Sequence, residues 1–252
     1  MNIPDWASAP EVPELVPNEL HVWRAPLSPT IDQLDSFGDV LSSDESVRRA
    51  RFRFEEHRQS WSASRTVLRH VISQYIRVPP GEIRFDYNKY GKPELRRDQN
   101  HLDLCSNTSY SSKIMVCAIS SGMRVGVDIE RVRDLDDLDR LADRVFSATA
   151  LRSLHELPHD QKIRAFFNCW TRKEAYSKAL GLGLSLPPDS FDVTFRLEEP
   201  PRITRVSNPS VDLSGWLLAD LPLDEQFAGA VAVEGLPSRI RSWLWDWDRI
   251  PN

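Results

Sequence analysis

The stretch from Phe166 to Leu184, FFNCWTRKEAYSKALGLGL, constrains the fold more than any other part of the chain. Its first part is rich in the good helix formers Lys, Glu, Ala, Arg and Leu, and it contains no Pro or Gly before Gly181. Gly181 and Gly183 then end the predicted helix, as glycines at helix C-termini commonly do. Glu174 and Lys178 stand four residues apart and therefore share one face. An exposed Glu–Lys pair on a helix usually has no function. Here the density of Trp, Lys and Glu ahead of two glycines favours a functional site.

The composition is that of an ordinary soluble globular protein. The chain has 252 residues, of which 40% are apolar and 27% charged, enough for one large domain or two of about 120 residues. A formal net charge of −5 argues against a general nucleic-acid binder, in which basic residues prevail. No segment approaches the ~18 apolar residues of a membrane span, and the acidic, Pro-containing N-terminus lacks the layout of a signal peptide. With 3 cysteines and no CxxC spacing, we expect reduced thiols in a cytoplasmic protein that binds neither nucleic acid nor membrane.

Helices and strands are mixed in both halves of the chain. Residues 1–17 are Pro-rich, and we expect them to form an extended lead-in outside the core. Residues 18–121 and residues 122–252 each combine a helical section with strands that look antiparallel. Runs of strands beside helices, without strict alternation, are typical of the α+β class.

Strands are also predicted in the middle of the chain and near its C-terminus. Leu102–Ser106 and Ile114–Ile119 are predicted strands, and the hydroxyl-rich Asn107–Ser112 between them is predicted to be a loop. Near the C-terminus, Ser242–Trp247 carries three tryptophans in alternation. We expect these tryptophans to pack in a core, with a partner surface as the alternative.

The stretch Arg124–Val132, RVGVDIERV, shows the period-two alternation of a strand. Its valines and isoleucine fall on one face, and Gly126, Asp128 and Glu130 fall on the other. Acids on a strand face are usually exposed and need no ligand. Together with Glu174 of the following helix, however, they offer the hard oxygen ligands that Mg²⁺ prefers, with waters and substrate phosphates completing its shell.

The first half offers positive charge to match. Six arginines lie close together in its sequence: Arg48, Arg49, Arg51, Arg53, Arg58 and Arg65. Such a cluster could hold phosphates, although a solvated helix face would need no ligand. Lys178, one helical turn beyond Glu174, could stabilise charge on a leaving phosphate. These residues together predict a phosphate-containing ligand between the two halves.

The motifs of this chain resemble those of the 4′-phosphopantetheinyl transferases. The two signature motifs are GVDIE at Gly126–Glu130 and WTRKEAYSKALGLGL at Trp170–Leu184, which is followed by SLPPDSFDV. Segments of the first half that resemble the family are SRTVLR at Ser64–Arg69, GKPEL at Gly91–Leu95 and NTSYS at Asn107–Ser111. The likeness is to the surfactin-synthetase-activating (Sfp-like) type, with two similar halves in one chain, rather than to the short trimeric carrier-protein synthases.

The resemblance implies an enzyme that moves the 4′-phosphopantetheine arm of coenzyme A to a serine of an acyl or peptidyl carrier protein and releases 3′,5′-ADP. It implies a monomer of two α+β halves related by a pseudo-twofold axis, with the active site in the cleft between them. Asp128, Glu130 and Glu174 would hold Mg²⁺, and Glu174 would also help to deprotonate the serine. Lys178 would stabilise the leaving phosphate. The residues that bind coenzyme A would be Arg53, Arg65, Thr66, Lys92, Pro93, Ser109, Tyr110, Asp128 and Lys178.

Two positions depart from the family pattern. Tyr110 stands where the family commonly has His, and it can donate a hydrogen bond but cannot carry positive charge. Ala150 stands where many members carry a Glu that has been considered as a base. Since neither change removes one of the three acids, we expect activity.

Two other readings stay open at this point. One is a non-catalytic relative that binds coenzyme A or carrier proteins, and the other is an unrelated module whose acids are surface charges. The carrier is also open among fatty-acid, polyketide, nonribosomal-peptide and lysine-biosynthetic ones. We expect the segment Arg131–Phe146, which follows the acidic strand, to contribute to partner choice.

Overall fold

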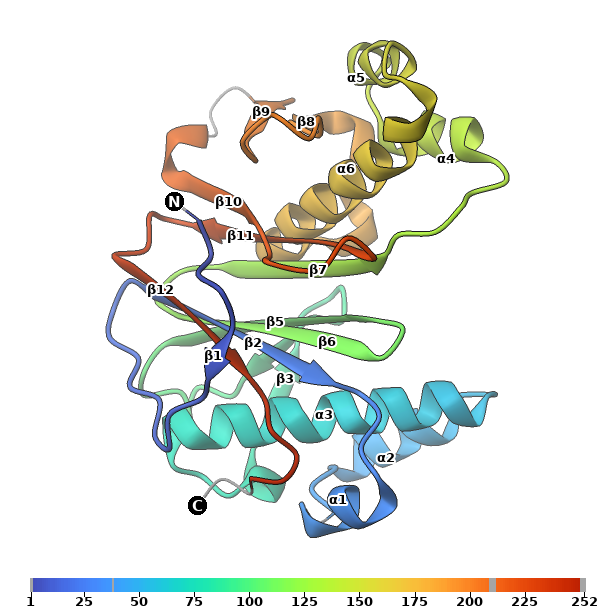
Figure 1. Ribbon diagram of the computed structural model, residues 1–252. Helices are drawn as coiled ribbons and strands as arrows, with labels where there is room; N and C mark the ends of the chain where they lie inside the picture. The colour runs from blue at the N-terminus through green and yellow to red at the C-terminus, as the bar shows by residue number, and fades with distance from the viewer. Residues whose placement is uncertain (1, 38, 209–211, 250–252) are drawn as a thin grey trace.

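The computed structural model of the chain describes residues 2–37, 39–208 and 212–249. Four layers are stacked in the order helix, sheet, sheet, helix (Figure 1). The outer layers are two long helices, α3 (Glu55–Ile76) and α6 (His159–Leu180), each of 22 residues. This arrangement, with a long helix on the outer face of each sheet, confirms the α+β class.

The sheet of the first half has five strands in the order β1-β12-β2-β6-β5. The strands are β1 (Ala7–Ser8), β12 (Arg239–Leu244), β2 (Glu19–Pro26), β6 (Ile114–Ser121) and β5 (Leu104–Ser111). Smaller elements surround α3: α1 (Ile31–Ser36), α2 (Ser43–Ala50), the 3-10 turn η1 (Pro80–Glu82) and the hairpin β3 (Phe85–Tyr87) with β4 (Pro93–Leu95). The core of this half forms because Met115, Cys117 and Ile119 of β6 alternate toward the apolar stripe of α3.

The sheet of the second half has three strands in the order β10-β11-β7. These are β10 (Trp216–Asp220), β11 (Phe227–Glu234) and β7 (Val125–Arg131), all antiparallel to their neighbours. Around α6 lie α4 (Leu138–Val145), α5 (Ala148–His155) and the pair β8 (Phe191–Val193) and β9 (Ile203–Val206). Three 3-10 turns complete this half: η2 (Gly183–Ser185), η3 (Pro188–Ser190) and η4 (Leu213–Gly215).

The inner faces of the two sheets pack against each other. Val22 of β2 and Val116 of β6 share a buried cluster with Val127 of β7 and Val231 of β11. This shared core explains why the valines of β7 alternate with its acids, since one face of the strand is committed to the other half. None of the helices in residues 2–37, 39–208 and 212–249 is long and apolar enough to cross a membrane.

The structure differs from three expectations. Residues 107–111 are not a loop but the end of β5, in register with β6 from Leu104↔Ser121 to Ser111↔Ile114. The described part of the predicted lead-in, residues 2–17, is not outside the core, because Ile3 is buried between the sheets and β1 pairs with β12. The pairing of β12 is parallel rather than antiparallel.

The end of the chain crosses the expected division near residue 121. Strand β12 adds to the free edge of β2, and Trp243, Trp245 and Trp247 join the core of the first half beside Trp23 and Phe37. The tryptophans therefore pack in a core, as expected, but in that of the first half. The domain boundaries taken from the sequence otherwise stay a prediction.

Candidate active site

Strand β7 and helix α6 approach each other so closely that only glycine fits between them. A Cβ on Gly126 would lie 2.1 Å from the carbonyl oxygen of Ala175 and 2.3 Å from the amide nitrogen of Ala179. Real Cβ atoms do not come this near to backbone, so Gly126 is required where the helix crosses the strand. The crossing places Glu174 and Lys178, four residues apart on α6, beside the acids of β7.

Asp128 is the centre of the site. Its side chain is buried, at 4% exposure, and Oδ1 accepts hydrogen bonds from Lys178 Nζ at 2.6 Å and from Ser109 Oγ at 2.8 Å. Lys178 Nζ also reaches Ser109 Oγ at 3.1 Å and the Val127 carbonyl at 3.3 Å. The other oxygen, Asp128 Oδ2, is buried without a hydrogen-bond partner among the described residues. A buried carboxylate oxygen without a donor is costly, so this atom marks a place for a ligand.

Glu130 and Glu174 complete a group of three carboxylates. Burial raises the pKa of Glu130, and the negative charge of Asp128 raises it further. Burial likewise raises the pKa of Glu174, with added repulsion from Asp128 and Glu130 that Lys178 partly offsets. The three groups therefore repel one another through a poorly solvated space. Perturbed carboxyls of this kind are common at functional sites.

The acids belong to the second half, but polar side chains of the first half hold them. Ser111 Oγ donates to Glu130 Oε2 at 3.0 Å and accepts from the Arg131 amide, also at 3.0 Å. Asn107 Oδ1 accepts from the amide of Val127 at 2.9 Å. Asn107, Ser109 and Ser111 thus form a row on one face of β5 that bonds to β7. Asn107 and Ser111 were not among the predicted site residues, although their period-two spacing with Ser109 indicates that all three share one face of the strand.

Lys92 also joins the two halves. Its Nζ donates to the carbonyls of Val125 at 3.0 Å and of Lys178 at 2.8 Å, and burial lowers its pKa. Next to it, Asn88 Nδ2 donates to the carbonyl of Gly181 at the end of α6. Pro93 follows Lys92 as the first residue of β4, and it is half-buried. Lys92 therefore bonds the backbone beside the acids, rather than projecting freely toward a ligand.

The remaining predicted phosphate ligands do not gather at this point. Arg65 is buried and forms an ion pair with Glu45, which Arg69 also contacts. Thr66 is buried and lines a separate cavity of about 190 Å³ with Arg49. Arg53 is exposed and lies over the ring of Phe54, 5.5 Å from its centroid. The structure therefore does not bring Arg53, Arg65 and Thr66 together at the acids, and their role in binding coenzyme A stays a prediction.

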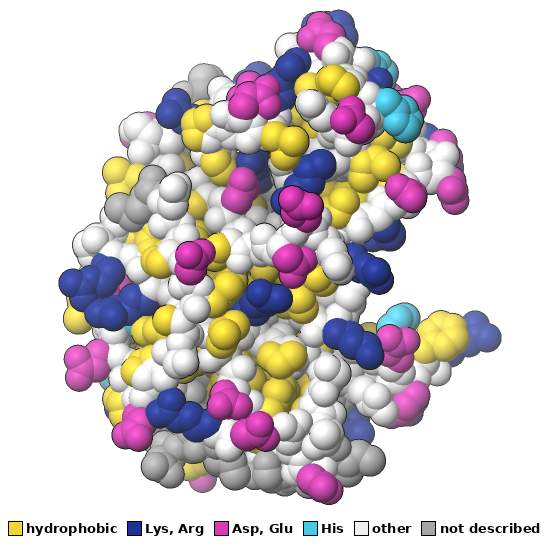
Figure 2. Space-filling view, in the orientation of Figure 1, with side chains coloured by type: hydrophobic (Ala, Val, Ile, Leu, Met, Phe, Trp, Pro, Cys, Tyr) yellow, Lys and Arg dark blue, Asp and Glu magenta, His cyan; other side chains and the backbone are white. Residues whose placement is uncertain are grey.

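Two other arginines of that stretch do line a large cavity. It measures about 940 Å³, and its lining consists of Ser43, Asp44, Val47, Arg48, Arg51, Phe52 and Tyr87. Tyr110, the residue after Ser109 on β5, interacts electrostatically with Arg48 of this cavity. Burial raises the pKa of the Tyr110 phenol, which Arg48 partly offsets. Figure 2 shows the molecule indented on its right-hand side, with Lys and Arg side chains at both edges of the indentation.

Ala150 has a methyl side chain and therefore offers no acid or base. It is buried in the core of the second half with Phe146 and Leu154. Within the described ranges, no three His, Cys, Asp or Glu side chains form a group that could hold a metal ion in the present rotamers. Lys178, bonded to Asp128, stands among the three acids.

Models of one protein family match both halves of the chain. Residues 124–232 match the 4′-phosphopantetheinyl transferase superfamily, and residues 25–122 match the 4′-phosphopantetheinyl transferase N-terminal family. The chain belongs to the 4′-phosphopantetheinyl transferase family and is an enzyme of that class.

Particular relatives agree with this assignment. The chain is 35% identical to 4′-phosphopantetheinyl transferase HetI of Nostoc sp., over 94% of this chain and 97% of the relative. It is 31% identical to 4′-phosphopantetheinyl transferase Sfp of Bacillus subtilis, over 64% of this chain and 70% of the relative. A holo-(acyl-carrier-protein) synthase from Bacillus anthracis, solved in complex with CoA (3′,5′-ADP), covers 43% of this chain at 21% identity and a TM-score of 0.36. The chain covers 92% of that structure, but a likeness this low carries no argument.

Proposed function

We propose that this protein transfers the 4′-phosphopantetheine arm of coenzyme A to a serine of an acyl or peptidyl carrier protein and releases 3′,5′-ADP. Family membership supports the reaction class. The single observation that carries the proposal for this chain is the cluster of Asp128, Glu174 and Lys178, built on both family motifs. These three side chains bring acid, base and positive charge to one buried point between the halves.

The reaction is a displacement at phosphorus. The serine Oγ of the carrier forms a bond to the phosphorus that bears the pantetheine, and the bond from that phosphorus to the bridging oxygen breaks. The bridging oxygen leaves with 3′,5′-ADP. Glu174 takes the serine proton, directly or through water, and its raised pKa brings it nearer to the working pH of a base. Lys178 stabilises the negative charge that develops on the leaving phosphate.

We further propose that Asp128, Glu130 and Glu174 hold Mg²⁺. The residues fit a divalent cation, because Asp128 Oδ2 is buried without a donor among the described residues. Burial raises the pKa of Glu130 and Glu174, and repulsion by Asp128, which a cation would relieve, raises both further. When bound, Mg²⁺ would neutralise pyrophosphate charge and orient the phosphates. The rotamer of Lys178, which now bonds Asp128, would adjust as the ligands assemble.

The cavity beside Arg48 and Arg51 is the proposed site for the nucleotide end of coenzyme A. The reacting pyrophosphate must lie at the acids, so the separate 3′-phosphate needs its own counter-charge. Arg48 and Arg51 supply it, and Phe52 and Tyr87 offer aromatic surface to the base. Tyr110, which interacts electrostatically with Arg48, has a hydroxyl that can donate to a phosphate oxygen.

The remaining expectations stay part of the proposal. Because β5 and β7 of the two halves meet at the acids within one chain, we propose that the protein acts as a monomer, and its proposed location is the cytoplasm. The carrier protein would approach along residues 131–146, which leave β7 next to Glu130 and contain α4. The carrier stays open among fatty-acid, polyketide, nonribosomal-peptide and lysine-biosynthetic carriers, and the panel tested should contain all four.

Intact-mass spectrometry of a panel of apo carrier proteins tests the reaction. Each carrier is incubated with the protein and coenzyme A, in Mg²⁺ or in excess EDTA. We expect one carrier serine to gain the mass of phosphopantetheine only with Mg²⁺, while 3′,5′-ADP is released. If coenzyme A binds but no carrier is modified, the chain is a binding-only relative and the proposal fails. Equal transfer in EDTA would support the proposed reaction but would show that it does not need Mg²⁺.

A further inference from the structure

Most residues that line the cavity beside Arg48 and Arg51 are solvent-exposed, and they come from one short segment of the chain. Six of its seven lining residues belong to α2 or to the two residues that follow it, and only Tyr87 comes from elsewhere. The position of the two guanidinium groups therefore depends on how α2 is attached to the protein. This inference rests on the proposed binding of the coenzyme A nucleotide in this cavity.

Helix α2 has no apolar anchor. Its sequence is SDESVRRA, and Glu45 is its one buried residue, at 1% exposure. Val47, the helix's valine, is 55% exposed. A helix of 8 residues is too short to be stable by itself, and most surface helices gain stability from a buried apolar face. In α2 a buried carboxylate takes the place of that face.

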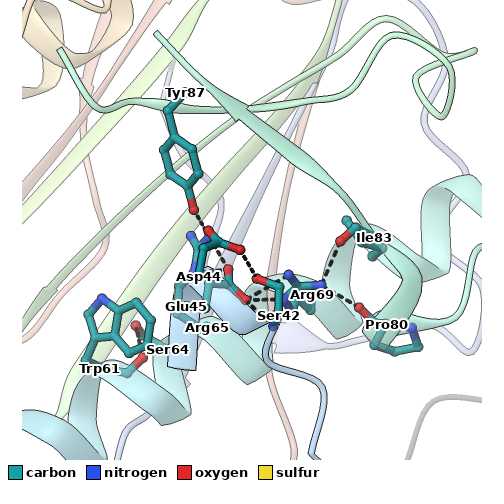
Figure 3. A network of polar contacts seen from close by, with 10 residues as sticks. All are labelled: Ser42, Asp44, Glu45, Trp61, Ser64, Arg65, Arg69, Pro80, Ile83 and Tyr87. Carbon is teal, nitrogen blue, oxygen red and sulfur yellow. Dashed lines mark hydrogen bonds and ion pairs between the residues drawn. The ribbon is translucent and has the colours of Figure 1, made fainter. Parts of the chain in front are cut away.

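Figure 3 shows where the carboxylate is held. Arg65 Nε donates to Glu45 Oε1 at 2.8 Å, and Arg65 Nη2 forms a second, shorter contact with the same oxygen. Arg69 Nε donates to Oε2 at 2.7 Å, and Arg69 Nη2 forms an ion pair with the same oxygen, also at 2.7 Å. The amide of Ser42, at the N-cap of α2, donates to Oε2 at 3.1 Å. Both oxygens of Glu45 are thereby bonded, to α3 on one side and to the start of α2 on the other.

The two arginines are fixed in turn. Arg69 Nη1 donates to the carbonyls of Pro80 at 2.8 Å and Ile83 at 2.9 Å, and Arg69 is 1% exposed. Arg65 Nη2 lies 3.4 Å from the hydroxyl of Tyr87, the remaining residue of the cavity wall. One network therefore connects both sides of the cavity through Glu45.

The charge balance keeps Glu45 ionised. Burial alone would raise its pKa, but Arg65 and Arg69 outweigh burial and lower the pKa below its ordinary value. The guanidinium of Arg65 is therefore held by Glu45, although its place in the sequence made it a candidate for phosphate binding. Its role is to hold Glu45.

We propose that Glu45 is a positioning residue: paired with Arg65 and Arg69, it fixes α2 so that Arg48 and Arg51 surround the 3′-phosphate of coenzyme A, which Glu45 itself does not touch. The network then sets affinity for the nucleotide end of the substrate. It leaves the displacement at Asp128, Glu174 and Lys178 unchanged.

The test compares Glu45→Gln with the unchanged protein in transfer assays with coenzyme A and with 3′-dephospho-coenzyme A. We expect the KM for coenzyme A to rise about tenfold, because a charge-assisted network that aligns two guanidiniums is lost. The kcat at saturation should stay within about twofold, and the KM for the dephospho substrate should hardly change. Arg48→Gln should raise the same KM, and adding Glu45→Gln to it should cost much less than the two separate effects combined. Glu56→Gln, at an exposed acid in the first turn of α3, is the control and should match the unchanged protein.

Other results would overturn the inference. An equal rise in both KM values, or a fall in kcat with KM unchanged, would show that Glu45 acts only on general stability or on the chemistry. If Glu45→Gln does not fold, Glu45→Asp, which keeps the charge but has a shorter reach, is measured in the same way. It must show the same selective rise, and an unchanged KM for coenzyme A would contradict the inference. If the unchanged protein transfers from both substrates with equal KM, the cavity does not bind the 3′-phosphate and this inference fails, while the proposed reaction stands.

Discussion

Ser109 of β5 and Asp128 of β7 join the two halves of the molecule: the serine hydroxyl donates to Asp128 Oδ1 at 2.8 Å. Lys178 of α6 reaches both side chains, so three segments far apart in the sequence meet at one carboxylate. The second oxygen of Asp128 stays without a partner among the residues described. The site is thus assembled by the packing of the halves, and its stability and its chemistry depend on the same contacts.

Gly126→Ala should destabilise the protein by about 3 kcal/mol, since the new methyl group would overlap backbone atoms of Ala175 and Ala179 that cannot move independently of the helix. Displacement of α6 would also lower the transfer rate. Urea unfolding measures the first effect. Gly215→Ala is the matched control, because a Cβ there meets nothing within 4 Å, and it should leave the free energy of unfolding nearly unchanged. Equal stability of the two variants would contradict the close crossing of α6 and β7.

Lys92→Met should lower the free energy of unfolding by about 2 kcal/mol, because the carbonyls of Val125 and Lys178 would lose a charged donor in a poorly solvated place. Lys113→Met, at an exposed lysine in the β5–β6 turn, is the control. Chemical denaturation of both variants provides the measurement. A rise in KM for coenzyme A without any loss of stability would instead mean that Lys92 serves only the ligand.

Asn107→Ala should cost about 2 kcal/mol, since the amide of Val127 would be left without its acceptor at the junction of the two sheets. Thr108→Ala changes the neighbouring residue, whose side chain alternates to the other face of β5, and should cost clearly less. Denaturation curves of the two variants measure and compare these two losses of stability. Similar losses would argue that the row on β5 does not hold β7.

Stability should fall as the pH is lowered from about 6.5 toward 4. Burial lowers the pKa of His21 to about 4, while the nearby Glu19 acts in the opposite direction. In the unfolded chain His21 takes up a proton below its ordinary pKa of 6.5, whereas in the folded protein it stays neutral until about 4. The stabilisation is therefore complete above pH 6.5 and is lost between 6.5 and 4, by up to about 3 kcal/mol. His21→Gln should unfold with a flatter dependence on pH over this range, and parallel curves for both proteins would contradict the assignment.

Local periodicity revealed the acids but not what surrounds them. The alternation of β7 and the four-residue spacing on α6 are properties of short segments, and both appear in the structure as the sequence predicts. The stretch from Asn107 to Ser111 looked like a loop because Asn and Ser favour turns; pairing with β6 overrides that preference. Counting arginines likewise could not reveal that Glu45, 20 residues before Arg65, forms an ion pair with it. The return of β12 to the first sheet joins segments more than 200 residues apart, beyond the reach of any local pattern.

The most direct test of the account is the initial rate of carrier modification by Asp128→Asn and Glu174→Gln at saturating coenzyme A and Mg²⁺. Glu56→Gln, at an exposed acid of α3, is the control, and circular dichroism confirms that all three variants are folded. We predict that Asp128→Asn and Glu174→Gln each lose at least about 100-fold in rate, because each removes charge from the point where the phosphate is transferred, while the control keeps the full rate. Rates within about threefold of the unchanged protein in either folded variant would contradict a transfer site built on these two carboxylates.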